Sequence, residues 1–345
     1  MTAENGASQL LLGIDLGTSR TVVKSNRGEQ AVVHSVVGYP KDIIGVKLLG
    51  ASEIFGEEAV KKRSYLDLYT PLESGVLKEG SDRDIEAARE LIKHAVSLAK
   101  PRPGDSICGI IGVPARASLA NKELLLNIAK QVMDVALVVS EPFMVAYQIG
   151  QLKNAIIIDI GAGTTDICGM KGTIPGPGDQ VTITKGGDYI DRILAGAISQ
   201  NFPDVQMTQH LAKVIKEQHA FVGEPKGVKL INLRADGKPV QYDLTAELRM
   251  ACETIMPDII ENLMNIVAGF DPEDQEEALD NIYVAGGGSR IAGIDQYIRT
   301  QMRDYGRVTV RLVDDPEYAG CSGGLKLATE LPPAYWDQLG EMIGA

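Results

Sequence analysis

The stretch AIIIDIGAGTTDICGM at residues 155–170 contains an apolar run, a sharp glycine-containing turn and a second apolar run. This pattern predicts a buried strand, a turn and a returning strand. The stretch LLLGIDLGTSRTVVK at residues 10–24 has the same arrangement earlier in the chain. Two such units predict a protein of two related halves that face one ligand.

Both turns carry residue types that bind phosphate groups. Glycines let backbone N–H groups approach phosphate oxygens, and Thr or Ser hydroxyls add donors. An aspartate at the strand end repels phosphate unless Mg²⁺ lies between them, usually through waters that the ion keeps. One motif of this kind is more often an ordinary Asp-Gly turn, but two at repeated strand ends favour a clamp on one triphosphate. We therefore expect Asp15 and Asp159 to place Mg²⁺, and the phosphates to be held by Gly17, Thr18, Ser19, Gly161, Gly163 and Thr164.

A third element is the run VAGGGSR at residues 284–290, which follows an expected strand over residues 282–285. Gly286, Gly287 and Gly288 would form a flat backbone floor for a base or sugar, with the N-terminus of a following helix facing the α-phosphate. Taken alone, such a run is more often a plain loop. The chain has no GxxxxGK[ST] and no GxGxxG, so a P-loop is excluded and a Rossmann dinucleotide site is unsupported.

Between these elements, strands and helices alternate, which predicts an α/β sheet containing parallel strands. Residues 34–70 mix short strands with glycine and proline and look like a small insertion, and residues 187–253 form a helix-rich one. The expected elements are helices over residues 82–99, 117–133, 141–149 and 256–267, and strands over residues 107–113 and 136–139.

Composition excludes several functional classes. The 345 residues carry a net charge of −12, so no basic footprint for nucleic acid dominates. No apolar run approaches the roughly 18 residues that span a bilayer. The four cysteines are far apart and form no CxxC pair, which favours reduced, buried thiols in a cytosolic protein over disulfides or zinc.

The three phosphate and nucleoside elements, in this order, resemble the actin/Hsp70/sugar-kinase ATPase superfamily. Residues 11–23 look like its phosphate-1 loop, 158–167 its phosphate-2 loop and 284–290 its adenosine motif, while 139–147 and 315–328 resemble its two connecting helices. The resemblance implies an α/β actin-like fold of two lobes, each a five-stranded mixed sheet flanked by helices. It divides the chain into a lobe I core (1–33, 71–153 and 325–345), an outer subdomain (34–70), a lobe II core (154–186 and 254–324) and a second outer subdomain (187–253).

The same resemblance assigns further residues. Ile215-Lys216-Glu217 matches the run that contacts the ribose and adenine in actins, and the less favoured alternative is an exposed charged helix face. Glu141 stands where bacterial actins carry the glutamate that positions the attacking water. Its alternative role is helix capping, since Glu is favoured in a first turn. The implied activity is hydrolysis of ATP, with Glu141 and Asp159 as catalytic residues and ATP and Mg²⁺ as cofactors, bound in the cleft between the lobes.

Several runs narrow the resemblance to the magnetosome-associated bacterial actins. They are SVVGYPKD at 35–42, RSYLD at 63–67, GVPARAS at 112–118, DIGAGTTDIC at 159–168 and LPPAYW at 331–336. The resemblance implies a cytoplasmic, ATP-dependent homopolymeric filament that organises, positions and segregates magnetosome chains. Magnetosome-associated linker proteins are the expected partners, with no nucleic acid. Residues 1–9 carry no basic amphipathic helix, so no direct membrane insertion is expected.

Three alternatives remain open from the sequence. The first is a monomeric kinase of the same fold that passes the γ-phosphate to a small molecule. It would need an acidic base beside an acceptor pocket, and no candidate other than Glu141 is found. The second is another bacterial actin, which shapes cells or segregates plasmids. The third is a non-catalytic nucleotide sensor, which would leave both Asp15 and Asp159 without a role.

Overall fold

The computed structural model describes residues 8–78, 80–332 and 334–336. The chain forms two compact units, unit 1 over Met1–Gln151 and Glu317–Ala345 and unit 2 over Leu152–Pro316. The chain therefore passes from unit 1 into unit 2 and back once. The ends of the predicted lobe I core, residues 1–7 and 337–345, lie outside the described residues.

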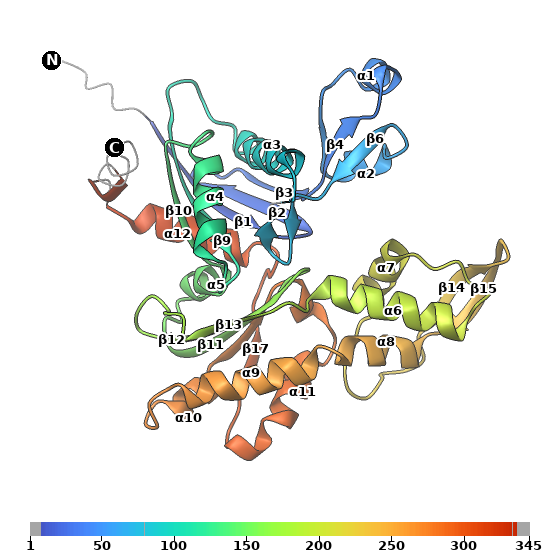
Figure 1. The fold of residues 1–345 in the computed structure, drawn as a ribbon. Coiled ribbons are helices and arrows are strands. Elements are labelled where there is room, and N and C mark those ends of the chain that lie inside the picture. The colour runs from blue at the N-terminus through green and yellow to red at the C-terminus, as the bar shows by residue number, and fades with distance from the viewer. Residues whose placement is uncertain (1–7, 79, 333, 337–345) are drawn as a thin grey trace. The chain divides into compact units, whose positions relative to one another are not determined.

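Unit 1 is built on a five-stranded sheet with the strand order β10-β9-β1-β2-β3 (Figure 1). β1 pairs in parallel with β9, which pairs in parallel with β10, while β1, β2 and β3 pair antiparallel. The apolar runs form strands because their side chains are buried, Leu10, Leu12 and Ile14 completely so. The bounds are β1 Gln9–Leu16, β2 Arg20–Ser25, β3 Gln30–His34, β9 Ser106–Val113 and β10 Val135–Ser140.

Unit 1 also contains four helices besides those of residues 35–77, and capping residues determine where two of them begin or end. The Ser118 side chain accepts from the N–H of Asn121, so the helix begins at Leu119, two residues after the predicted start at 117. It ends at Ala129, four residues before the predicted end at 133. Gly150 ends α5 at a φ of 73°, a conformation that favours glycine. The bounds are α3 Asp82–Leu98, α4 Leu119–Ala129, α5 Glu141–Ile149 and α12 Ala319–Glu330.

Residues 35–77 of unit 1 form two small sheets of their own. The three-stranded sheet has the order β5-β4-β6, and the two-stranded sheet, β7-β8, follows. The mixture of short strands agrees with the sequence pattern, but two short helices in this segment were not predicted. The bounds are β4 Val37–Pro40, α1 Ile43–Leu49, β5 Ile54–Phe55, α2 Gly56–Lys61, β6 Leu66–Tyr69, β7 Leu72–Glu73 and β8 Val76–Leu77.

Unit 2 contains the second five-stranded sheet, with the order β13-β12-β11-β16-β17. β11 and β12 form the predicted antiparallel hairpin, and β16 and β17 extend the sheet in parallel. The prediction of two five-stranded mixed sheets is therefore confirmed. The bounds are β11 Lys153–Ile160, β12 Thr165–Lys171, β13 Gln180–Ile183, β16 Ile282–Ala285 and β17 Val310–Leu312.

The insertion over residues 187–253 contains helices, as predicted, and also a β-hairpin that was not predicted. The hairpin turns at Asp236-Gly237, where both residues have a positive φ, 48° and 79°. An Asp-Gly pair favours this two-residue turn. The bounds within the insertion are α6 Gly187–Asn201, α7 Gln209–His219, β14 Leu230–Ala235, β15 Lys238–Asp243 and α8 Thr245–Glu253.

The helices of unit 2 that follow the insertion are α9 Met256–Ala268, α10 Gln275–Asp280 and α11 Ile294–Gln301, with 3₁₀ turns at Gly287–Arg290 and Arg303–Tyr305.

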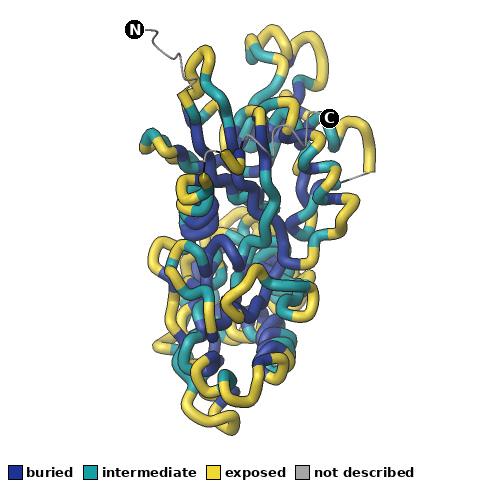
Figure 2. The backbone as a smooth tube through the Cα atoms, turned by 90° about the vertical axis from the view of Figure 1, so that its left-hand side faces the viewer, coloured by how far each residue is buried: buried dark blue, intermediate teal, exposed yellow. Residues whose placement is uncertain are grey.

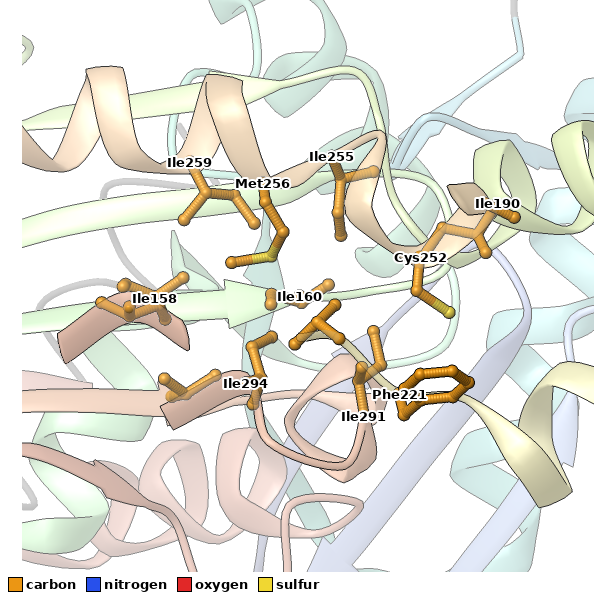
Figure 3. Close-up of a cluster of buried hydrophobic side chains, with 14 of the residues drawn as sticks. Ile158, Ile160, Ile190, Phe221, Cys252, Ile255, Met256, Ile259, Ile291 and Ile294 are labelled. Carbon is orange, nitrogen blue, oxygen red and sulfur yellow. The ribbon is translucent and has the colours of Figure 1, made fainter. Parts of the chain in front are cut away.

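Each unit has its own hydrophobic core, and the buried residues follow the central strands while the loops are exposed (Figure 2). In unit 2, Ile158 and Ile160 of β11 lie among Met256 and Ile259 of α9 and Ile294 of α11 (Figure 3). All five side chains are completely buried. This packing fixes the strand that leads into the predicted phosphate-2 turn.

Candidate functional site

In unit 1, the predicted site residues lie at one edge of the sheet. Asp15 near the end of β1 is the register partner of Gly112 in β9, and Gly112 is in turn the partner of Val139 in β10. Glu141 follows β10 directly as the first residue of α5. Because the three strands are parallel, Asp15 and Glu141 occur at the same carboxyl edge, where ligands of open α/β sheets bind.

The turn Gly17–Ser19 is held from two sides. The N–H of Gly17 donates to the carbonyl of Arg20 at 3.1 Å, and a Cβ on Gly17 would lie 2.7 Å from that oxygen, so only glycine fits. Ser35 donates its hydroxyl to the carbonyl of Gly17 at 2.7 Å, and the N–H of Gly75 donates to Thr18 Oγ1 at 2.7 Å. Two residues that follow the turn at a distance in sequence therefore fix its shape.

Asp15 lies against the first turn of α12. A Cβ on Gly320 would be 2.6 Å from Asp15 Oδ2, so the glycine is what allows the carboxylate to lie there. Burial raises the pKa of Asp15 to about 6. A nearby cation would favour the ionised form and lower that pKa. A hard carboxylate oxygen in this environment fits Mg²⁺.

The position of Glu141 agrees with both roles that the sequence left open. It begins α5, next to Pro142, where an acidic side chain interacts favourably with the helix dipole. Gly112 of β9 lets α5 come close, because a Cβ there would be 2.5 Å from Met144 Cε and 3.2 Å from Glu141 Cγ. Capping does not move the carboxylate from the strand edge, so one side chain can serve both roles.

In unit 2, the predicted metal residue and the predicted nucleoside motif are neighbours. Asp159 of β11 is the register partner of Ala285 in β16, and Gly286 follows at once with a φ of 70°. A Cβ on Gly286 would overlap Asp159 Oδ1 and lie 2.5 Å from the carbonyl oxygen of Ile160. A Cβ on Gly288 would lie 2.5 Å from Ile160 Cβ, whereas one on Gly287 would meet nothing within 4 Å. Gly287 thus presents the open part of this backbone.

The prediction of a helix directly after the three glycines was wrong, because a short 3₁₀ turn comes first. Residues Gly287–Arg290 form a 3₁₀ turn, closed by the Ser289 hydroxyl donating to the carbonyl of Gly286 at 2.7 Å. The α-helix begins only at Ile294, after Gly293 at a φ of 82°. The short turn satisfies the backbone groups locally, so the N–H groups nearest the motif are those of a 3₁₀ turn.

The turn at Gly161–Thr164 is closed by the N–H of Gly161, which donates to the carbonyl of Thr164 at 2.9 Å. Gly163 lies within it. The Thr164 hydroxyl donates to Asp166 Oδ2 at 2.8 Å, and Thr182 donates to Asp166 Oδ1 at 2.5 Å. Asp166 is 1% exposed. The hydroxyl hydrogen of Thr164 therefore points into the protein, and a phosphate contact by this residue would come from its backbone N–H.

Lys216 and Glu217 lie on α7. The Lys216 ammonium donates to the carbonyl of Gly187 at 2.8 Å and forms an ion pair with Asp191 Oδ1 at 2.7 Å. Glu217 is exposed on the helix face. The two predicted residues therefore differ in exposure, because the Lys216 side chain is mostly buried and Glu217 is exposed.

Sequence reasoning missed three residues that hold the predicted turns, Ser35, Gly75 and Asp166, and it missed Asp191, the partner of Lys216. Asp166 follows the second threonine of the phosphate-2 motif directly, and Asp191 belongs to the run GGDYID at residues 186–191, so both could have been found. Ser35 and Gly75 are distant in sequence from the turn that they hold. No local signal marks them.

Among the described residues, no three His, Cys, Asp or Glu side chains gather closely enough to hold a metal by themselves. A bound Mg²⁺ would therefore depend on water and phosphate oxygens besides a carboxylate. No helix in the described parts of the chain is both long enough and apolar enough to cross a bilayer.

The two five-stranded mixed sheets, each with a strand–turn–strand unit that presents an aspartate, define an actin-like fold. The chain matches the MreB/Mbl protein family over residues 9–332 and belongs to that family. It is 55% identical over 338 residues to the Actin-like protein MamK of Paramagnetospirillum magneticum, covering 98% of this chain and 97% of that protein.

Two solved structures are similar over most of the chain. A MamK double helical filament is 54% identical with a TM-score of 0.92, covering 94% of this chain and 100% of that one. A non-polymerising MamK mutant bound to AMPPNP is 54% identical with a TM-score of 0.76 and the same coverage. The resemblance to a bacterial actin that the sequence indicated is confirmed.

Proposed function

We propose that this protein binds ATP with Mg²⁺, hydrolyses it and assembles with itself into a filament. The observation that carries the proposal is the repeated strand–turn–strand unit with an aspartate at the strand end, once in each unit. Its support is the similarity to MamK, which forms a double helical filament and, as a non-polymerising mutant, binds AMPPNP.

The phosphates would be held by backbone N–H groups of the two turns, Gly17–Ser19 and Gly161–Thr164. Hydrogen bonds from Ser35 and Gly75 keep the first turn in one shape before a ligand arrives. Gly286–Gly288 and Glu217 would contact the nucleoside. Such preformed donors need no rearrangement at the moment of reaction.

Mg²⁺, placed by Asp15 and Asp159, would supply charge neutralisation on the phosphate oxygens when bound. Phosphoryl transfer needs little covalent help, so the remaining task is to orient the attacking water. Glu141 would accept a hydrogen bond from that water at a carboxylate oxygen and take its proton. Its place at the edge that also carries Asp15 supports this role.

The proposal extends to the role in the cell. The runs that resemble magnetosome-associated actins support a cytoplasmic filament that organises, positions and segregates magnetosome chains through linker proteins. We also propose that residues 34–70 and 187–253 act as outer subdomains of the two lobes. The first contains a sheet of its own, and the second contains the hairpin β14-β15. Co-sedimentation of the pure protein with liposomes would count against attachment through partner proteins.

The test is light scattering with parallel phosphate release from the pure protein after addition of Mg-ATP at physiological salt. We expect a rise in scattering that later decays as phosphate appears. The net charge of −12 opposes self-association, so assembly should be slower at low salt. Flat scattering with slow phosphate release would refute the filament and point to the kinase of the same fold, for which acceptor molecules would then be screened.

A further inference from the structure

Three parts of unit 2 are in contact at one place, namely the phosphate-2 turn Gly161–Thr164, the start of α6 and Lys216 of α7. We propose that Lys216 and Asp191 form a buried ion pair that positions the turn Gly161–Thr164, so that they are positioning residues for the β- and γ-phosphates. This inference rests on the proposed binding of ATP. It changes the part assigned to Lys216, from a contact of the nucleoside to a support of the phosphate turn.

The pair is inside the protein. Asp191 is 1% exposed, and the Lys216 side chain is 12% exposed. Two of the three ammonium hydrogens are used, one by Asp191 and one by the carbonyl of Gly187. Burial raises the pKa of Asp191, and the positive charge of Lys216 acts against that shift. Removal of one partner would leave the other charge buried without compensation, which is strongly unfavourable.

The ion pair is connected to the turn through one residue. Gly187 accepts from Lys216 through its carbonyl and donates through its own N–H to the carbonyl of Gly161 at 2.9 Å. The next N–H, that of Asp188, donates to the carbonyl of Ala162 at 2.8 Å. The position of the ammonium group therefore determines where the backbone of the turn lies.

The junction has no room to absorb a shift. A Cβ on Gly186 would lie 2.6 Å from the carbonyl oxygen of Ala162, and one on Gly187 would lie 2.9 Å from Lys216 Nζ. On its other side α6 is fixed by Ile190, which is buried in the same hydrophobic cluster as Ile160 (Figure 3). Close-packed interiors transmit displacements instead of damping them.

The two assignments of Lys216 give different ligand dependences. A direct contact with the nucleoside would strengthen the binding of adenosine, AMP, ADP and ATP by the same factor. A support of the phosphate turn would strengthen only the binding of ligands whose β- or γ-phosphate reaches that turn. Asp191 pairs with Lys216. If the pair supports the turn, Asp191 would also affect only the ligands that carry a β- or γ-phosphate.

The experiment measures competition of ATP, ADP, AMP and adenosine against a fluorescent ATP analogue, using the full chain. For Lys216→Met and for Asp191→Asn we expect the affinity for ATP and ADP to fall about tenfold or more, as displaced supporting groups typically cause. The affinity for AMP and adenosine should change by less than about threefold. Lys216→Arg keeps the charge and should restore part of the loss.

The control is Asp258→Asn, which breaks a Lys–Asp pair of the same unit that is about one-third exposed, Lys185 with Asp258. It should leave all four affinities unchanged. Equal losses for all four ligands in Lys216→Met, with Asp191→Asn like the wild type, would overturn the inference. Wild-type protein that binds no ATP would overturn the proposed function and this inference with it.

A second measurement works without any ligand and keeps the inference testable if Lys216→Met does not fold. In Asp191→Asn, hydrogen exchange at the amides of Gly187 and Asp188 should become faster, because these amides donate to the turn. Exchange at α11, which is not part of the junction, should be unchanged. Unaltered exchange at both amides would contradict the positioning role.

Discussion

The substitution Gly323→Ala tests how closely the two helices α5 and α12 of unit 1 pack. Gly323 is buried in α12, and a Cβ there would overlap the carbonyl oxygen of Met144 and lie 2.6 Å from its carbonyl carbon. Ordinary contact begins at 3.4 Å. Because the carbonyl oxygen lies closer than the carbonyl carbon, the helices would have to separate by more than the roughly 0.8 Å that the carbon alone requires. The obstacle is backbone, so no side-chain rotation relieves it.

Overpacking of this kind typically costs about 1–3 kcal/mol and sometimes more, and backbone against backbone belongs at the upper end. Alanine in a helix interior returns about 1 kcal/mol relative to glycine. The net expectation is a destabilisation of about 2 kcal/mol. For a domain of roughly 150–250 residues, this corresponds to a melting temperature lower by about 4–8 °C.

The assay is thermal melting of the full chain without nucleotide, followed by circular dichroism and calorimetry. The matched control is Gly196→Ala in α6, since that glycine is exposed and a Cβ there would meet nothing within 4 Å. The control should gain about 0.5–1 kcal/mol. If Gly323→Ala melts at or above the wild-type temperature, the close approach of α5 to α12 is refuted.

Three further predictions concern the site and the acid stability. Glu141→Ala should bind ATP within about threefold of the wild type but release phosphate about a hundredfold more slowly, and unchanged turnover would remove Glu141 from the water-positioning role. Asp159→Ala should lower Mg²⁺-dependent hydrolysis about a hundredfold, and normal rates at limiting Mg²⁺ would contradict its metal role. Arg27 and the N–H of Arg102 lower the pKa of Asp105 from 3.8 to about 2, so its ionised form stabilises the fold above pH 4 and this contribution is lost as the pH falls toward 2. In urea unfolding at several pH values, the gap between wild type and Asp105→Asn should therefore be constant above about pH 5 and narrow below pH 4.

The central strands of the two sheets were predictable because their signal is local, whereas the edge strands β3 and β17 were not among the predicted elements. Apolar runs that end in Asp-x-Gly turns carry the strand, the turn and its chemistry within a few residues. The third strand, β16, has the predicted bounds 282–285. The two short helices of residues 43–61 were missed because they are only seven and six residues long. Such lengths fall below what helical periodicity can indicate.

The site was predictable as a set of positions and not as a set of contacts. The location of Thr164 follows from the motif, but the direction of its hydroxyl depends on how Asp166 is oriented, and Asp166 is held in turn by Thr182, 16 residues further along the chain. In the same way, the sequence indicates Lys216 but does not contain its pairing with Asp191, 25 residues earlier. Side-chain partners arise from tertiary packing, which no single run of residues encodes.

The return of the chain into unit 1 at Glu317 has a consequence for synthesis on the ribosome. β1 is translated first, yet α12, which packs on it so closely that a Cβ on Gly13 would overlap Cys321, is translated after all of residues 152–316. Unit 2 is one uninterrupted segment and can fold as soon as it emerges. Unit 1 cannot complete its fold until α12 has been translated, and until then one face of β1 is uncovered. A nascent chain stalled before residue 319 therefore exposes an apolar surface that chaperones would recognise.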